Sequence, residues 1–188
     1  MTGSVVSIYG GSAARPGDDT WREAEAFAAR LARAGVTIAT GGYGGVMEAA
    51  SRGAAAQGGR VLGVTCDDIE AWRGVRPNAY VGEEVRVPRL RDRVVRLMEM
   101  GNALAAFPGG VGTLSEVALS WSMLQTGALA PRPFVLVGES WRAVLRTFLD
   151  TAQGFLHSDD ERLLIFAPDG EAAAETILRH LAGPQPDL

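Results

Sequence analysis

The 188-residue chain is 47% hydrophobic and carries 18 basic against 22 acidic residues, a net charge of −4 that argues against duplex nucleic acid as the main partner. All 18 basic residues are arginines, which excludes enzymes that hold pyridoxal phosphate as a lysine Schiff base. The absence of lysine also excludes a standard P-loop nucleoside triphosphatase, whose motif places a lysine at the β- and γ-phosphates.

Short apolar runs alternate with amphipathic stretches along the chain, and most of the joints between them are rich in glycine. The predicted strands, in chain order, are 5–9, 36–39, 60–65, a less regular piece over 80–87, 103–107, 134–137 and 163–166. The predicted helices are 21–34, 46–57, 89–100, 114–126, 141–152 and 171–181, and residues 66–79 are expected to form a polar loop.

The predicted strands are mostly apolar throughout, which is typical of strands covered by helices on both faces. Repeated strand–loop–helix units favour a parallel sheet with right-handed crossovers. The sequence therefore predicts an α/β fold, a doubly wound, Rossmann-like and mainly parallel sheet flanked by helices on both faces. We expect one domain over residues 1–183 and a frayed tail over 184–188.

The single cysteine and the hydropathy bear on where the protein works. Cys66 can form no internal disulfide and has no cluster of Cys or His around it, so we expect a buried thiol in a reducing compartment. No uninterrupted apolar run approaches the length that spans a membrane. These features predict a soluble, cytoplasmic protein with no membrane partner, in which His157 and His180 lie on the surface.

Three glycine-rich loops follow predicted strands, over residues 10–12, 41–45 and 109–112. In a parallel sheet such loops meet at the carboxyl edge, where ligands bind at helix N-termini. Glycine lets the backbone approach an anion closely, so three converging loops fit a phosphorylated ligand. No loop has the form G-x-G-x-x-G, which leaves a dinucleotide dehydrogenase as the weaker alternative. The simpler interpretation is that these glycines only permit tight turns and close packing.

Residues 113–116 have two interpretations. Thr113 followed by Glu116 matches a capping box, with Thr113 at the N-cap and Glu116 at the third helical position. The preceding glycine loop would aim the same helix end into the proposed site, where the Glu116 carboxylate could orient water or stabilise a cationic transition state. The two interpretations compete for one side chain.

The helix predicted over 89–100 carries Arg89, Arg93 and Arg96 on one face. Such a row is usually solvated and pairs with acidic neighbours such as Asp92 or Glu99. Periodicity by itself singles out none of the three arginines.

Residues 108–116 read P-G-G-V-G-T-L-S-E, which resembles the P-G-G-x-G-T-x-x-E motif of the LONELY GUY family of cytokinin riboside 5′-monophosphate phosphoribohydrolases. Arg93 stands fifteen residues before Pro108, at the place of the family's arginine. Residues 41–47 are similar to the family's second glycine-rich loop, which ends in Gly-x-Met. The resemblance extends from Val5 to about Leu149.

The resemblance implies that Glu116 and Arg93 act at the N-glycosidic bond of a nucleoside 5′-monophosphate, such as AMP or an N6-modified AMP. An ionised Glu116 would stabilise positive charge on the ribose, and Arg93 could clamp ribose or phosphate oxygens. The residues expected to bind the phosphate and nucleotide are Gly109, Gly110, Val111, Gly112, Thr113, Ser12, Gly41, Gly42, Gly44 and Met47. No metal and no organic cofactor is expected.

Two positions depart from the cytokinin-activating pattern. Those members usually have a second basic residue after the catalytic arginine, where this chain has Val94. Glu48, after Met47, is more similar to a sister branch that includes molybdenum-cofactor carrier proteins. A non-catalytic carrier of a phosphorylated pterin is therefore the second hypothesis.

The family is typically dimeric, so the resemblance also implies a homodimer. The helices around the motif would supply its interface, with a surface that could include Met98, Met100, Trp121 and Met123. Trp121 and Met123 are expected as either core or dimer contacts.

Overall fold

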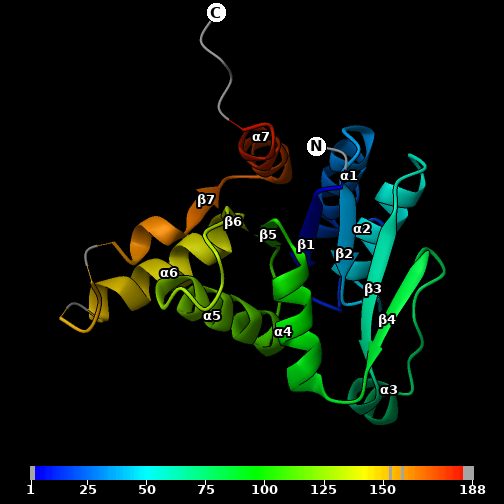
Figure 1. Ribbon diagram of the computed structural model, residues 1–188, viewed down its shortest axis with the longest axis horizontal. Coiled ribbons are helices and arrows are strands. Elements are labelled where there is room, and N and C mark those ends of the chain that lie inside the picture. Colours follow the sequence, from blue (N-terminus) through cyan, green and yellow to red (C-terminus); the bar gives the residue numbers. More distant parts are fainter. Residues whose placement is uncertain (1–2, 153, 158, 184–188) are drawn as a thin grey trace, which may run out of the picture.

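The computed structural model describes residues 3–152, 154–157 and 159–183. The strands form one sheet in the order β4-β3-β2-β1-β5-β6-β7, with every neighbouring pair parallel (Figure 1). They are β1 (Val5–Tyr9), β2 (Thr37–Thr40), β3 (Val61–Cys66), β4 (Glu83–Val87), β5 (Ala103–Ala106), β6 (Phe134–Val137) and β7 (Ile165–Ala167). The predicted doubly wound, Rossmann-like α/β fold is confirmed. The tail predicted over 184–188 lies outside the described residues.

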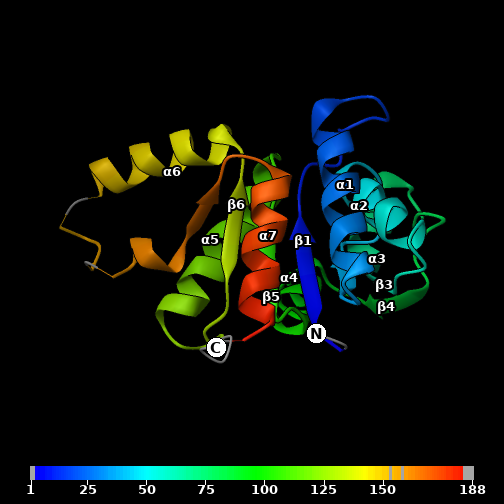
Figure 2. The ribbon, with the colours of Figure 1, turned by 90° about the horizontal axis from the view of Figure 1, so that it is seen from above.

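The helices are α1 (Asp19–Arg33), α2 (Val46–Ala55), α3 (Asp67–Arg73), α4 (Leu90–Met100), α5 (Val111–Gln125), α6 (Glu139–Thr151) and α7 (Gly170–Leu181), with a short 3-10 turn at Glu161–Leu163. Helices α1, α2 and α7 bury apolar side chains against one face of the sheet, and α4, α5 and α6 against the other. Figure 2 shows α1 and α7 on the near side of the strands and α4 on the far side. None of the described helices combines the length and apolarity that crossing a membrane requires.

The strand order places the crossover of the fold between β1 and β5. The chain winds outward from β1 to β4 and then returns to place β5 on the other side of β1. At such a switch point the chain passes from the two central strands to helices on opposite faces of the sheet, and ligands bind at the carboxyl ends of these strands. The loops after β1 and β5 are two of the three glycine-rich loops.

The polar loop expected after β3 is partly wrong, because residues Asp67–Arg73 form α3. Three acidic side chains lie in its first turn, where they interact favourably with the helix dipole. Gly74 ends the helix in a left-handed conformation with φ 63°. A seven-residue helix is too short to show an amphipathic period in sequence, so its polar composition suggested a loop.

Four residues were expected at a dimer surface, and two of them are core residues of the protomer. Met98 is fully buried, and Trp121 is 9% exposed and donates a hydrogen bond from Nε1 to the Asp160 carbonyl at 2.8 Å. Met100 and Met123 are half-buried against the same cluster. The surface prediction is therefore wrong for Met98, because α4 turns this side chain toward the sheet. Trp121, expected as a core or dimer contact, lies in the core. Cys66 is a buried free thiol, and His157 and His180 are exposed, as predicted.

Candidate active site

The three glycine-rich loops touch one another at the carboxyl edge of the sheet. The Gly11 N–H donates to the Pro108 carbonyl at 3.0 Å, and the Val46 N–H donates to the Gly11 carbonyl at 2.9 Å. A Cβ on Gly45 would collide with the Gly11 carbonyl, and a Cβ on Gly109 would lie 2.8 Å from the Gly11 nitrogen. These glycines therefore allow three loops to pack as one unit, and the loop after β1 is its centre.

The N-terminus of α5 offers free backbone donors at this edge. The first intrahelical bond runs from the Leu114 N–H to the Gly110 carbonyl at 2.9 Å. The N–H groups of Val111, Gly112 and Thr113 find no acceptor within the described chain. A Cβ on Gly110 or Gly112 would meet nothing within 4 Å, so no described residue crowds these two glycines on that side. Three free N–H groups at the positive end of a helix dipole can bind a phosphate.

The capping box predicted for Thr113 and Glu116 is wrong. Helix α5 begins at Val111, with Gly110 as its N-cap, so Thr113 is already the third helical residue. Its buried hydroxyl lies beneath Gly109, where a Cβ would collide with Oγ1. Glu116 stands a further turn along the helix and cannot reach the N-cap. The Glu116 carboxylate therefore does not cap α5 and is available for another role.

Arg93 is buried, which contradicts the prediction of a solvated arginine row. Its Nε donates to the Val64 carbonyl at 2.8 Å, and its Nη2 donates to the Gly41 carbonyl at 3.0 Å. The sulfur of Met47 lies 3.6 Å from the same Nη2. Arg93 shares the buried face of α4 with Leu97, one turn further on, and this face packs on the sheet.

The flanking arginines of the row remain on the outside. Arg89 and Arg96 are exposed, and Arg89 lies 3.6 Å from Asp68 on α3. Of these three arginines, only Arg93 donates to the Val64 and Gly41 carbonyls, so the tertiary arrangement selects it from the row.

The loop after β2 makes close contacts within the protein. A Cβ on Gly41 would overlap the Arg93 guanidinium, so only glycine fits beside Arg93. The Gly42 N–H donates to Thr40 Oγ1 at 3.0 Å, and its carbonyl accepts from the Asn78 N–H at 2.8 Å. Gly44 is half-buried with open space around it, since a Cβ would meet only a Glu48 carboxylate oxygen at 3.7 Å.

Ser12 lies at the rim of the same edge. Its hydroxyl accepts a hydrogen bond from Arg73 Nη1 at 2.8 Å, and Arg73 is the last residue of α3. This contact ties the loop after β1 to α3.

Glu116 projects from α5 toward Arg93. The residue is 8% exposed, and its Oε1 lies 4.0 Å from Arg93 Nη1. No group in the described part of the chain donates a hydrogen bond to the carboxylate. Burial raises the pKa of Glu116 from its ordinary 4.5 to about 7, and the Arg93 guanidinium opposes that rise. A carboxyl group with this pKa exchanges its proton readily near neutral pH.

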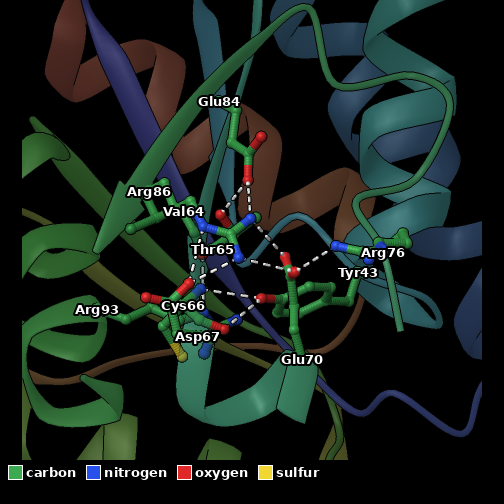
Figure 3. A network of polar contacts seen from close by, with 10 residues as sticks. All are labelled: Tyr43, Val64, Thr65, Cys66, Asp67, Glu70, Arg76, Glu84, Arg86 and Arg93. Atoms are coloured by element: carbon green, nitrogen blue, oxygen red, sulfur yellow. Dashed lines mark hydrogen bonds and ion pairs between the residues drawn. The ribbon is translucent and has the colours of Figure 1, made fainter. Parts of the chain in front are cut away.

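Helix α3, which the sequence analysis expected to be a loop, holds the elements around Arg93 in place. The buried Glu70 carboxylate accepts from Arg86 of β4 at 3.0 Å and from Arg76 at 3.1 Å (Figure 3). Asp68 Oδ2 accepts from the Leu90 N–H at 2.9 Å, which caps the start of α4. Helix α3 therefore joins β4 to the helix that carries Arg93.

Tyr43 was not predicted as a site residue, although it lies within the second glycine-rich loop. Its ring is buried, and its centroid lies 5.4 Å from Arg93 Cζ. A lone tyrosine in a glycine-rich loop gives no periodic signal, so this contact is visible only in three dimensions.

The site thus combines a helix end with free N–H groups, a carboxyl group with a pKa of about 7 and a buried guanidinium. Across the residues that the structure describes, no three His, Cys, Asp or Glu side chains gather as metal ligands. Such a site can bind a phosphorylated ligand and place a carboxylate beside a centre that develops positive charge.

Comparisons with known proteins point to one family. A family model described as "Possible lysine decarboxylase" matches residues 47–177. A probable cytokinin riboside 5′-monophosphate phosphoribohydrolase from rice (Oryza sativa subsp. japonica) is 30% identical over 149 residues, 74% of this chain. The match covers only 57% of that rice protein's length. A cytokinin riboside 5′-monophosphate phosphoribohydrolase from Rhodococcoides fascians is 28% identical over 184 residues, 94% of this chain and 90% of that protein.

Among solved structures, the molybdenum cofactor binding protein of Rippkaea orientalis superposes with a TM-score of 0.75 at 22% identity. The superposition covers 96% of this chain and 99% of that one, and at this identity it establishes the fold. The family match covers more than half of the chain and includes both Arg93 and Glu116. The chain belongs to the possible lysine decarboxylase family, the LONELY GUY family to which the motif at residues 108–116 points.

Proposed function

We propose that this protein hydrolyses the N-glycosidic bond of a nucleoside 5′-monophosphate, AMP or an N6-modified AMP, to the free base and ribose 5-phosphate. The observation that carries the proposal is the buried Glu116 carboxylate, which lacks a hydrogen-bond donor among the described residues and lies 4.0 Å from Arg93 Nη1. The names of the rice and Rhodococcoides fascians relatives support the same reaction.

The reaction follows from the placement of these groups. The 5′-phosphate would bind the free N–H groups of Val111, Gly112 and Thr113, which leaves the ribose near Glu116. As the bond from C1′ to the base nitrogen breaks, its electron pair leaves with the base and positive charge develops on the ribose. The ionised Glu116 stabilises that charge and accepts a proton from the water that attacks C1′. Glu116 then gives that proton to the nitrogen of the departing base, which yields the neutral base and regenerates the carboxylate.

Arg93 has one free side of its guanidinium for the substrate. Nε and Nη2 are committed to the Val64 and Gly41 carbonyls, whereas Nη1 faces Glu116. Nη1 can therefore donate to a ribose hydroxyl while its charge keeps part of the Glu116 population ionised. Decarboxylation through a lysine Schiff base is not open to this protein, because the chain has no lysine.

Turnover and its pH dependence test the proposal together. We expect the wild-type protein to release adenine from AMP, or N6-isopentenyladenine from isopentenyl-AMP. Because ionised Glu116 is the active form, kcat/KM should fall about tenfold per pH unit well below pH 7 and level off above it. The measurement is chromatography of released base from pH 5 to pH 9. Absence of base from both substrates would refute the hydrolase, and a flat profile would remove Glu116 from its role.

A non-catalytic carrier of a phosphorylated pterin is the second candidate, favoured by Val94 and Glu48 in place of the cytokinin-activating pattern. The structural likeness to a molybdenum cofactor binding protein is compatible with it. The carrier predicts tight binding of molybdenum cofactor that survives Glu116→Ala, together with no base release. Failure to bind that cofactor at micromolar concentration would exclude the carrier.

We also propose that the protein is a cytoplasmic homodimer. An apolar groove of about 470 Å³ lies between α5 and α6, and Leu114, Val144 and Phe148 along it are 42–50% exposed. Burying these side chains against a second copy would remove an apolar surface that monomers rarely expose. Light scattering should give about twice the chain mass of 19.8 kDa, and a mass of one chain would refute the dimer. The buried free thiol of Cys66 suits a reducing compartment.

A further inference from the structure

Tyr43 is anchored at its hydroxyl to the end of a neighbouring strand. The Cys66 N–H donates to the phenolic oxygen at 2.9 Å, and the phenol donates to the Cys66 carbonyl at 3.2 Å (Figure 3). Tyr43 belongs to the loop between β2 and α2, whereas Cys66 ends β3. The ring therefore bridges two elements and cannot rotate out of its place without losing both hydrogen bonds.

The backbone beneath the ring is held separately. Asn78 Nδ2 donates to the carbonyls of Gly42 and Tyr43, at 3.1 and 3.0 Å. The Asn78 N–H also donates to the Gly42 carbonyl. Both ends of the Tyr43 side chain are thus fixed by the protein before any substrate binds, which is the condition for it to orient another group.

The face of the anchored ring meets Arg93. Arg93 Cζ lies 5.4 Å from the ring centroid, within the range of a cation–π contact. Nε donates to Val64, which precedes Cys66 on β3, and Nη2 donates to Gly41, which precedes Tyr43 in the loop. The two carbonyl groups that hold the guanidinium therefore come from the two segments that the Tyr43 hydroxyl ties together, and Met47 of α2 adds a sulfur contact to Nη2.

We infer that Tyr43 is a positioning residue, which holds the Arg93 guanidinium in the orientation that points Nη1 at the Glu116 carboxylate. The inference rests on the proposed function, because the orientation of Arg93 affects catalysis only if the protein is a hydrolase. The effect of Tyr43 on Arg93 and, through it, on Glu116 can be measured without turnover. Tyr43 itself need not touch the substrate, because its ring lies beside Arg93 and its hydroxyl is used by Cys66.

The electrostatic consequence has a definite sign. Glu116 is faced by Arg93 from α4 and by Tyr9 from β1, and Tyr43 is faced by Arg93, Cys66 and Glu70. Arg93 is the cation that lowers the pKa of Glu116 against the effect of burial. If loss of the Tyr43 ring lets the guanidinium move away, the pKa of Glu116 must rise and less of it is ionised at neutral pH.

The experiment compares Tyr43→Phe and Tyr43→Leu with wild type, and Tyr80→Leu is the matched control because Tyr80 is an exposed tyrosine. The titration of the Glu116 carboxyl is followed by carbon-13 NMR, with the signal assigned by its loss in Glu116→Gln. We expect Tyr43→Leu to raise the pKa of Glu116 by about one unit. Its kcat should fall about tenfold, with a much smaller change in KM.

The two variants separate the ring from the hydroxyl. Tyr43→Phe keeps the ring but releases it from Cys66, so we expect shifts in the same direction and about a third as large. Tyr80→Leu should behave as wild type. If Tyr43→Leu does not fold, Tyr43→Phe decides, and an unchanged Glu116 titration and kcat in that variant would overturn the inference.

The experiment distinguishes an error in the proposed hydrolase activity from an error in the role of Tyr43. If wild type releases no base, the reaction is wrong, yet the NMR titration still measures the coupling of Tyr43 to Glu116. If wild type is active and both Tyr43 variants titrate and turn over as wild type, only the positioning inference fails.

Discussion

Glu116→Gln is expected to lower kcat/KM for base release by about 10³-fold while leaving the protein folded. The amide has the shape of the carboxyl group but can neither accept the proton of the attacking water nor stabilise positive charge on the ribose. Chromatographic assay at pH 8, where wild-type Glu116 is ionised, gives the largest contrast. Glu99→Gln is the matched control, because Glu99 is an exposed glutamate on α4.

The same substitution should increase stability, which distinguishes a functional carboxylate from a structural one. The folded state raises the pKa of Glu116 from 4.5 to about 7, so the folded protein holds this proton more tightly than the unfolded chain. The cost of ionising Glu116 therefore grows as pH rises from about 4.5 to 7 and stays constant above, at about 3 kcal/mol.

At pH 8 we expect Glu116→Gln to melt roughly 5–10 °C above wild type, and at pH 4 the difference should nearly vanish. Calorimetry at the two pH values measures the effect. A variant that keeps more than a tenth of the activity, or that melts lower than wild type at pH 8, would contradict the role assigned to Glu116.

Arg93→Lys is expected to lower kcat/KM by about 10²-fold, and Arg93→Ala by more. A lysine ammonium keeps the positive charge, but it lacks the planar fork that reaches the Val64 and Gly41 carbonyls and still points a donor at Glu116. In Arg93→Ala the opposing charge is lost, so the pKa of Glu116 should rise further and the acid limb of the pH profile should move upward.

A glycine pair tests whether the position of Arg93 matters as well as its presence. Gly41→Ala would drive a methyl group into the guanidinium and displace it, whereas a methyl group on Gly82, just before β4, meets only the Val61 carbonyl oxygen at 3.6 Å. We expect Gly41→Ala to lose at least tenfold in kcat/KM and the control Gly82→Ala to stay within about twofold of wild type. Equal activity of the two variants would show that displacing Arg93 has no catalytic cost.

Local patterns in the sequence predicted much of the fold. Apolar runs that alternate with helical stretches predicted the parallel sheet, because burial on both faces of a strand leaves a direct compositional mark. The prediction failed at α3, where seven residues are too few for a periodic signal. It also failed at the start of α5, where Gly110 rather than Thr113 is the N-cap.

The candidate site was predictable only in part. The motif at residues 108–116 and its resemblance to a known family identified Glu116, the glycines and the partner Arg93. Periodicity by itself would have left Arg93 on a solvated face, because it reports spacing along one helix and not what that helix packs against. Tyr43 and Asn78 were not predicted either, because they lie in loops and their contacts are to residues distant in the sequence.

The sequence by itself determined the class of fold, the glycine-rich loops at the strand ends and the exclusion of lysine-dependent chemistry, since these depend on composition and local order. Only the tertiary structure decided which arginine is buried, why Gly41 must lack a side chain and how α3 supports α4. The physical reason is that the pKa of Glu116 and the orientation of Arg93 depend on burial and on groups far apart in the chain, which meet only when the sheet assembles.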